Sequence, residues 1–150
     1  MGKIVVGVNG SDPSTAALTW AVDEARLRGY MVEAVLAYDL KRVLGSNYPQ
    51  PATKPGVDLQ ARMIRARAQD LLHDTLRCVD AGQVTVEPIL RERSNPVDEL
   101  VQRSHSAELL VLGTGRRSRF SHRFNPSIAV RCLDRARCPV VIVPEPNEPT

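Results

Sequence analysis

Short apolar segments alternate with helical segments along the whole chain, and this alternation limits the fold more than any other feature of the sequence. The apolar segments are rich in Val, Ile and Leu, which is typical of strands that are buried on both faces. Five such strands are predicted, over residues 3–8, 31–38, 84–90, 108–113 and 139–143. Strands of this kind joined by helices predict an α/β fold, in which helices cover both faces of a parallel sheet.

Local signals mark where the helices begin and end. The first helix is expected to follow Asp12, a suitable N-cap, with Pro13 as its first residue and Gly29 at its end. Pro88 indicates an edge strand, because proline cannot donate a hydrogen bond to a neighbouring strand. Further helices are expected over residues 58–80, over residues 95–106 and from residue 125 onward. The strands and helices therefore alternate from one end of the chain to the other.

The chain of 150 residues has the size of one domain. We expect residues 1–144 to form a single domain, with residues 39–57 as a long loop and residues 145–150 as a frayed tail. The longest apolar runs, about six residues, fall far short of the ~20 that a membrane helix needs. No secretory signal opens the chain, and an odd number of cysteines is typical of reduced thiols. The sequence predicts a cytoplasmic protein without membrane association.

The net charge of +3 conceals one concentrated basic segment. Residues 113–137 contain seven arginines and one acid, a local charge of +6, so the other 125 residues sum to +3 − 6 = −3. The first part of this segment joins a strand end to a helix start, where free backbone N–H groups favour an anion. Arginine side chains suit phosphate because their donors form a fork. From the residues alone, an anion-binding loop and a merely solvated basic loop both stay open.

Motifs of common catalytic sites are absent or incomplete. Gly113 and Gly115 follow a strand, but a dinucleotide-binding loop would need a third glycine near Ser118. The chain has no Gly-Lys-Ser/Thr of a P-loop and no Gly-x-Ser-x-Gly of an α/β-hydrolase. Its histidines lie in separate segments, and Cys132 and Cys138 are predicted to be small core residues. We therefore expect neither a metal site nor a catalytic nucleophile.

Three segments carry a family resemblance: residues 3–11 with residues 17–22, residues 108–113, and residues 138–144. In this order and spacing they resemble the universal stress protein (UspA-like) family over nearly the whole chain. The resemblance implies a three-layer α/β/α fold with a five-stranded parallel sheet, of the adenine-nucleotide α-hydrolase-like (Rossmann-like) topology. It also implies a homodimer formed through the last strand, Pro139 to Val143, whose exposed edge favours pairing.

The same resemblance implies a phosphate loop that is degenerate in this chain. In ATP-binding members the loop reads Gly, two residues, Gly, nine residues, Gly, then Ser or Thr. Here the first glycine is Gly113 and the final hydroxyl is Ser127, but Arg116 and Pro126 replace the other two glycines. Arg116 adds bulk and Pro126 removes an N–H donor. The family's acidic residue after the first strand falls on Asn9, which is uncharged.

The resemblance therefore predicts a non-catalytic stress-response protein that binds ATP or another adenine nucleotide, with Mg²⁺ left open. The binding residues that it implies are Gly7, Asn9, Ala37, Leu112, Gly113, Arg116, Ser127 and Ile128. One alternative is a UspA-like dimeric interaction module that has lost ATP binding. A second alternative, nucleic acid or an acidic partner bound by the arginine-rich loop, is disfavoured because few aromatic residues accompany the charge. No residue pattern supplies a catalytic base, although slow ATP hydrolysis stays open.

Overall fold

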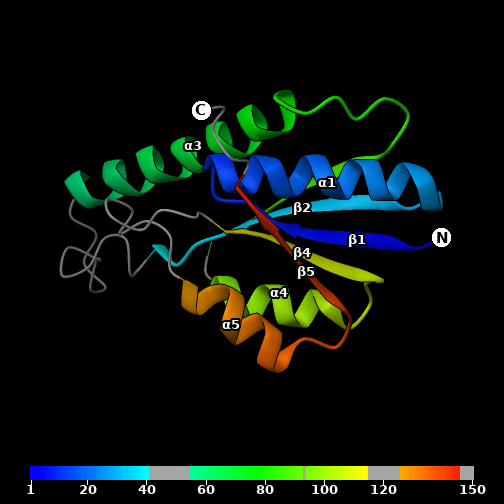
Figure 1. Cartoon of the computed structure of the whole chain (residues 1–150). Coiled ribbons are helices and arrows are strands. Elements are labelled where there is room, and N and C mark those ends of the chain that lie inside the picture. Colours follow the sequence, from blue (N-terminus) through cyan, green and yellow to red (C-terminus); the bar gives the residue numbers. More distant parts are fainter. Residues whose placement is uncertain (41–54, 93, 115–125, 146–150) are drawn as a thin grey trace, which may run out of the picture.

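Strands and helices alternate along the described part of the chain, as the sequence predicts. The structure is a computed structural model that describes residues 1–40, 55–92, 94–114 and 126–145. Its elements are β1 (Lys3–Gly7), α1 (Asp12–Arg28), β2 (Met31–Ala37), α3 (Pro55–Arg77), β3 (Val86–Arg91), α4 (Pro96–Ser104), β4 (Leu109–Thr114), α5 (Pro126–Arg135) and β5 (Val140–Pro144). The strands form one parallel sheet in the order β3-β2-β1-β4-β5. Figure 1 shows α1 and α3 on one face and α4 and α5 on the other, so the predicted three-layer fold is confirmed.

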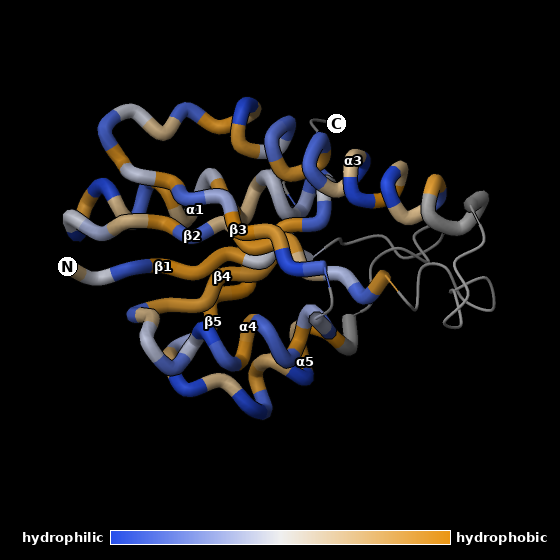
Figure 2. The backbone as a smooth tube through the Cα atoms, turned by 180° about the vertical axis from the view of Figure 1, so that it is seen from behind, coloured by the Kyte–Doolittle hydropathy of each residue, from blue (hydrophilic) through white to orange (hydrophobic). Residues whose placement is uncertain are grey.

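The two faces of the sheet bury two separate hydrophobic clusters. Ile4 and Val5 are neighbours on β1 and point to opposite faces, because successive side chains of a strand alternate. Both are fully buried, Ile4 in a cluster with Leu18 of α1 and Val5 in a cluster with Leu100 of α4. Figure 2 shows the hydrophobic residues concentrated along the strands and hydrophilic residues on the helices around them. Burial of β1 on both faces explains its unbroken apolar sequence.

The start of α1 corrects one local prediction. The N-cap is Ser11 and not Asp12, since Ser11 is extended (φ −87°, ψ 162°) and its side chain accepts a hydrogen bond from Ser14 N at 3.3 Å. Asp12 is the first helical residue instead, where its charge faces the positive end of the helix dipole. Gly29 ends the helix in the left-handed conformation (φ 71°), as predicted. The helix therefore begins directly after the turn that follows β1.

The ends of the other elements differ from the predictions by one to three residues. Helix α3 begins and ends three residues earlier than the predicted range of 58–80, because Pro55 takes the first helical position. None of the described helices, α3 included, combines the length and the hydrophobicity that crossing a bilayer requires. Pro88 lies in β3 at one edge of the sheet, which confirms the edge prediction.

Two side chains lie outside the core. Arg65 of α3 is partly exposed, and its Nη2 lies 2.8 Å from Glu92 Oε1 in an ion pair. Leu133 of α5 is 53% exposed. The face of α5 that packs on the sheet is formed by Ala129 and Cys132, three residues apart, and Leu133 is turned away from it by about 100°.

Glu33, a charged residue of β2, is buried and fully paired. Glu33 is only 7% exposed, and its carboxylate lies 3.0 Å from Lys3 Nζ and 3.0 Å from Arg103 Nη1. Arg103 also bonds Glu99 through Nε at 2.8 Å. Burial alone would lower the pKa of Arg103, but hydrogen bonds to Glu99 and Glu33 raise it above its ordinary value. These bonds tie α4 to the middle of the sheet.

We predict that Glu33→Gln lowers the free energy of unfolding by about 2–3 kcal/mol, because Lys3 and Arg103 lose their buried counter-charge. Urea titration followed by circular dichroism measures the loss. The matched control is Glu24→Gln, which removes a pair with Arg28 on the surface of α1 and should cost much less, because water screens exposed charges. Equal losses in the two variants would contradict a dominant role for the buried pair.

Candidate functional site

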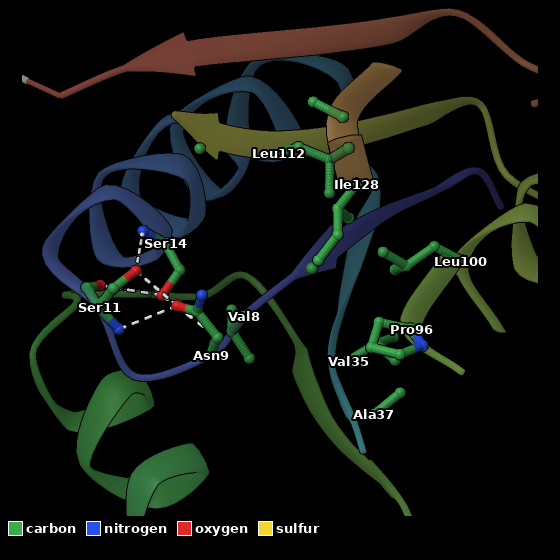
Figure 3. Close-up of a pocket in the computed structure, with 13 residues that line it drawn as sticks. Val8, Asn9, Ser11, Ser14, Val35, Ala37, Pro96, Leu100, Leu112 and Ile128 are labelled. Atoms are coloured by element: carbon green, nitrogen blue, oxygen red, sulfur yellow. Dashed lines mark hydrogen bonds between the residues drawn. The ribbon is translucent and has the colours of Figure 1, made fainter. Parts of the chain in front are cut away.

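A cavity opens at the carboxyl ends of β1 and β4, beside the amino-terminal turns of α1, α4 and α5 (Figure 3). Strand order reverses between β1 and β4, and this is where ligands bind in open α/β sheets. The cavity holds about 670 Å³ of empty space, its open mouth included.

Most of the residues implied by the resemblance meet at this cavity. Residues from three strands, a turn and a helix line it together: Gly7, Asn9, Ala37, Leu112, Gly113 and Ile128. Arg116 lies outside the described residues, and so does the side chain of Ser127. The structure therefore brings together the part of the predicted site that would face a base or sugar.

One side of the cavity is polar and is formed by the turn between β1 and α1. Asn9 Oδ1 accepts hydrogen bonds from the backbone N–H of Ser11 at 3.0 Å and from the Ser11 hydroxyl. The Ser14 hydroxyl accepts from Asn9 N at 3.3 Å and donates to the carbonyl oxygen of Ser11 at 2.9 Å. Because these bonds close on one another, the turn presents a fixed set of polar groups to the cavity.

The other side of the cavity is apolar. Figure 3 shows Leu100 and Pro96 of α4 beside Val35 of β2, with Leu112 and Ile128 above them. Most of these side chains belong to the hydrophobic cluster between the sheet and α4 and α5. An apolar wall facing a few fixed polar groups is the usual arrangement of a small-molecule binding site.

The main chain of Ala37 offers the cavity a donor and an acceptor that have no partner among the described residues. The register of β1 with β2 ends at Gly7 and Val35, whereas β2 stays paired with β3 as far as Ala37. The carbonyl of Val35 accepts from Val8 N at 2.9 Å, so its main-chain groups point toward β1. The main-chain groups of Ala37 also point toward β1, because in a strand the N–H and C=O of every second residue point to the same side. In the described register β1 has no residue opposite Ala37, and its N–H and C=O face the cavity.

Two glycines of the cavity have no room for a side chain. A Cβ on Gly113 would lie 2.1 Å from the carbonyl oxygen of Pro13, so β4 and α1 would have to separate. A Cβ on Gly7 would lie 2.8 Å from Leu112 Cδ2 and 3.1 Å from Leu100 Cδ1, which are the far ends of flexible side chains. Gly113 therefore allows the close approach of β4 to the start of α1. Because Gly7 has no side chain, Leu112 and Leu100 of the apolar wall keep their positions.

Ionisable groups of the described residues do not form a catalytic centre at the cavity. Its described lining contains no His, Cys, Asp, Glu, Lys or Arg, and no metal-binding cluster occurs among the described residues. Burial raises the pKa of the Cys132 and Cys138 thiols, which makes both poor nucleophiles. Tyr38, next to Ala37, has a buried hydroxyl without a partner among the described residues. Burial and the nearby charge of Glu92 raise its pKa, so the phenol stays neutral.

Sequence reasoning missed several residues that line the cavity. Ser11 is the N-cap of α1, and Ser14 carries the N–H that the cap side chain accepts from. Taking Ser11 as the N-cap from the sequence would have identified both residues. Pro96 and Leu100 lie one helical turn apart at the start of α4, which reaches the same end of the sheet. The sequence predicted a helix from residue 95, but the start of that helix was not connected to the site.

Comparison with known proteins agrees with this geometry. The model of the universal stress protein family matches residues 1–144. A universal stress protein of Mycobacterium tuberculosis is 32% identical over 158 residues, covering 97% of this chain and 50% of the relative. The chain spans about half the length of the mycobacterial relatives that it matches.

Solved structures share the fold. A protein of the universal stress protein family from Burkholderia pseudomallei has a TM-score of 0.66 and 25% identity, covering 95% of this chain and 96% of that chain. A universal stress protein in complex with cAMP has a TM-score of 0.56 and 25% identity, covering 95% of both chains. The likeness extends over the sheet and the helices that form the cavity.

We predict that Gly113→Ala lowers the free energy of unfolding by about 2–3 kcal/mol, because its methyl overlaps the main chain of Pro13. Gly7→Ala is the matched variant and should cost about 1 kcal/mol, since its methyl meets only the ends of two leucines. Thermal and urea denaturation of both variants measure the difference. A loss of the same size in each would mean that the contact with Pro13 is not the cause.

Proposed function

Because the chain belongs to the universal stress protein family, we propose that it is a non-catalytic binding protein whose cavity takes an adenine nucleotide. The observation that carries the proposal is the main-chain donor and acceptor of Ala37, which no other described residue pairs, beside an apolar wall. The described lining has no ionisable side chain, which supports a binding role over a catalytic one.

Adenine matches this arrangement. One edge of the base carries an amino donor next to a ring-nitrogen acceptor, which complements the C=O and the N–H of Ala37. The apolar wall formed with Leu100 and Leu112 supplies a surface on which the ring packs. The similar protein in complex with cAMP supports an adenine ligand for this chain as well.

The phosphates are proposed to lie toward the first turn of α5 and the basic segment before it. Helix α5 begins at Pro126, which has no N–H to donate to an anion. Arg116 and the arginines near it in the sequence would then bind phosphate through their side chains. No carboxylate lines the cavity among the described residues, so Mg²⁺ would be held by the phosphates of the ligand.

We predict saturable binding of ATP, AMP and cAMP in isothermal titration calorimetry, each displaced by the others. Gly7→Ala should weaken binding about tenfold, because the added methyl pushes Leu112 and Leu100 into the cavity. The control is Ala66→Leu, which adds bulk on the exposed face of α3 and should leave affinity unchanged. Repeating the ATP titration with EDTA in place of Mg²⁺ tests whether the metal ion contributes to the affinity for ATP.

Failure of all three nucleotides to bind at millimolar concentration would contradict the proposal. The interaction module without a nucleotide would then be the better description of the protein. Binding that Gly7→Ala does not weaken would instead place the ligand outside this cavity.

We also propose that two copies of the chain pair through β5. The two edges of the sheet differ: β3 carries Pro88 between Glu87 and Arg91, whereas residues 140–143 of β5 are all apolar and uncharged. Proline and charge protect an edge strand against pairing, and an uncharged edge invites it. This difference supports β5 as the interface.

We predict that Ile142→Pro converts a dimer into a folded monomer. Along a strand, the main-chain groups of successive residues point alternately to its two sides. Those of Pro139 and Glu145 bond β4, and Ile142 lies an odd number of residues from each, so its main-chain groups point to the free edge. Proline there removes an outward donor and keeps the bonds to β4. Light scattering measures the mass, and Ile142→Ala, which keeps the N–H, should stay dimeric. A wild-type mass near 16.5 kDa would contradict the interface.

A further inference from the structure

The carboxamide of Asn9 is held in one orientation at the cavity. Its Oδ1 accepts from Ser11 N at 3.0 Å and again from the Ser11 hydroxyl. A backbone N–H can only donate, so the atom that faces Ser11 N is the amide oxygen and not the nitrogen. The N–H of Asn9 itself donates to Ser14 Oγ at 3.3 Å, which fixes the main chain as well. Neither end of the residue is free to turn without breaking these bonds.

The amide nitrogen is therefore the group that Asn9 offers to a ligand. Nδ2 has no hydrogen-bond partner among the described residues, and Asn9 is an exposed part of the cavity lining. Figure 3 shows Asn9 at the cavity, with Ser11 and Ser14 to one side and Val8 to the other. Because both lone pairs of Oδ1 face Ser11, a bound molecule meets N–H donors at this residue.

Aspartate in the same position would have the opposite polarity. It has the same shape, and one carboxylate oxygen would keep both hydrogen bonds from Ser11. Its second oxygen would replace the NH₂ group and present a negatively charged acceptor. Residue 9 therefore decides which kind of atom the ligand must bring to this side of the cavity.

We propose that Asn9 is a specificity-determining residue that selects a nucleoside by donating from Nδ2 to an acceptor atom. The inference rests on the proposed nucleotide site and adds the polarity of one contact. The acceptor is an atom that carries no proton, such as a ring nitrogen of the purine. A hydroxyl would not discriminate, because it donates as well as accepts, and an N–H group is disfavoured because two donors would face each other. Ser11 acts as the positioning residue, since its two donors occupy the amide oxygen.

The first experiment titrates AMP and adenosine into the wild type and Asn9→Asp. Loss of the donor should weaken both ligands about five- to tenfold, and adenosine shows that phosphate repulsion is not the reason. The matched control is Asn95→Asp, which adds the same charge at the N-cap of α4, one residue before Pro96 of the lining. It should change adenosine affinity less than twofold. Asn9→Ala, a neutral variant, should lose as much adenosine affinity as Asn9→Asp.

Analogues identify the acceptor atom. The 3-deaza and 7-deaza forms of AMP each remove one ring nitrogen, and the 2′-deoxy and 3′-deoxy forms, which lack only a hydroxyl, serve as controls. The analogue that lacks the partner of Nδ2 should bind the wild type about five- to tenfold more weakly and bind Asn9→Ala with no further loss, as in a double-mutant cycle. In nitrogen–proton correlation spectra, the side-chain amide signal absent from Asn9→Ala should shift when AMP is added to the wild type.

The outcomes separate this inference from the proposed function. If the wild type binds AMP, and Asn9→Asp binds it equally well or more tightly, the donor role is overturned and nucleotide binding stands. An amide signal that does not move on binding overturns it in the same way. If neither the wild type nor the variants bind any nucleotide or adenosine, the proposed function is overturned, and the inference with it.

Discussion

The cavity exists because β1, the central strand, ends before β2 and β4 on either side of it. The turn that contains Asn9 and Ser11 takes the chain out of the sheet into α1, while β2 continues to Ala37 and β4 to Thr114. The two strands that flank β1 therefore stand apart at their carboxyl ends, and the main-chain groups of Ala37 on β2 are directed into the gap. A single early strand end thus produces both the space and the free polar groups that a ligand needs.

The walls of this gap are held by contacts that lie away from it. Helix α4 is tied to β2 through Arg103 and Glu33, at 3.0 Å, and to α5 through the pair of Asp98 and Arg135, at 2.8 Å. A further bond runs from Arg137 N to the buried hydroxyl of Ser104, at 3.0 Å. The bonds of Arg103 and Ser104, which are mostly buried, are the ones that position α4, because the pair of Asp98 and Arg135 is exposed and contributes little.

The fold and part of the site could be predicted from the sequence, because both depend on local patterns. Apolar strands and proline-marked helix starts predicted the layers, and parallel strands bring Asn9, Ala37 and Gly113 to one end of the sheet. Other features depend on contacts distant in the sequence. The burial of Glu33 requires Arg103, seventy residues away, and the space at Gly113 is decided by the carbonyl of Pro13. No local pattern contains either contact.

Two departures from the family pattern act on an anionic ligand in opposite directions. Proline at the start of α5 removes a backbone donor, which weakens attraction for a phosphate. Asparagine at residue 9, in place of the family's acidic residue, removes a negative charge from the same cavity. Two unit charges several ångströms apart near a protein surface interact by a few kcal/mol at most, which is comparable to a hydrogen bond made to a charged group. The second change can therefore offset the first, and the loss of glycines in the loop does not by itself imply loss of the ligand.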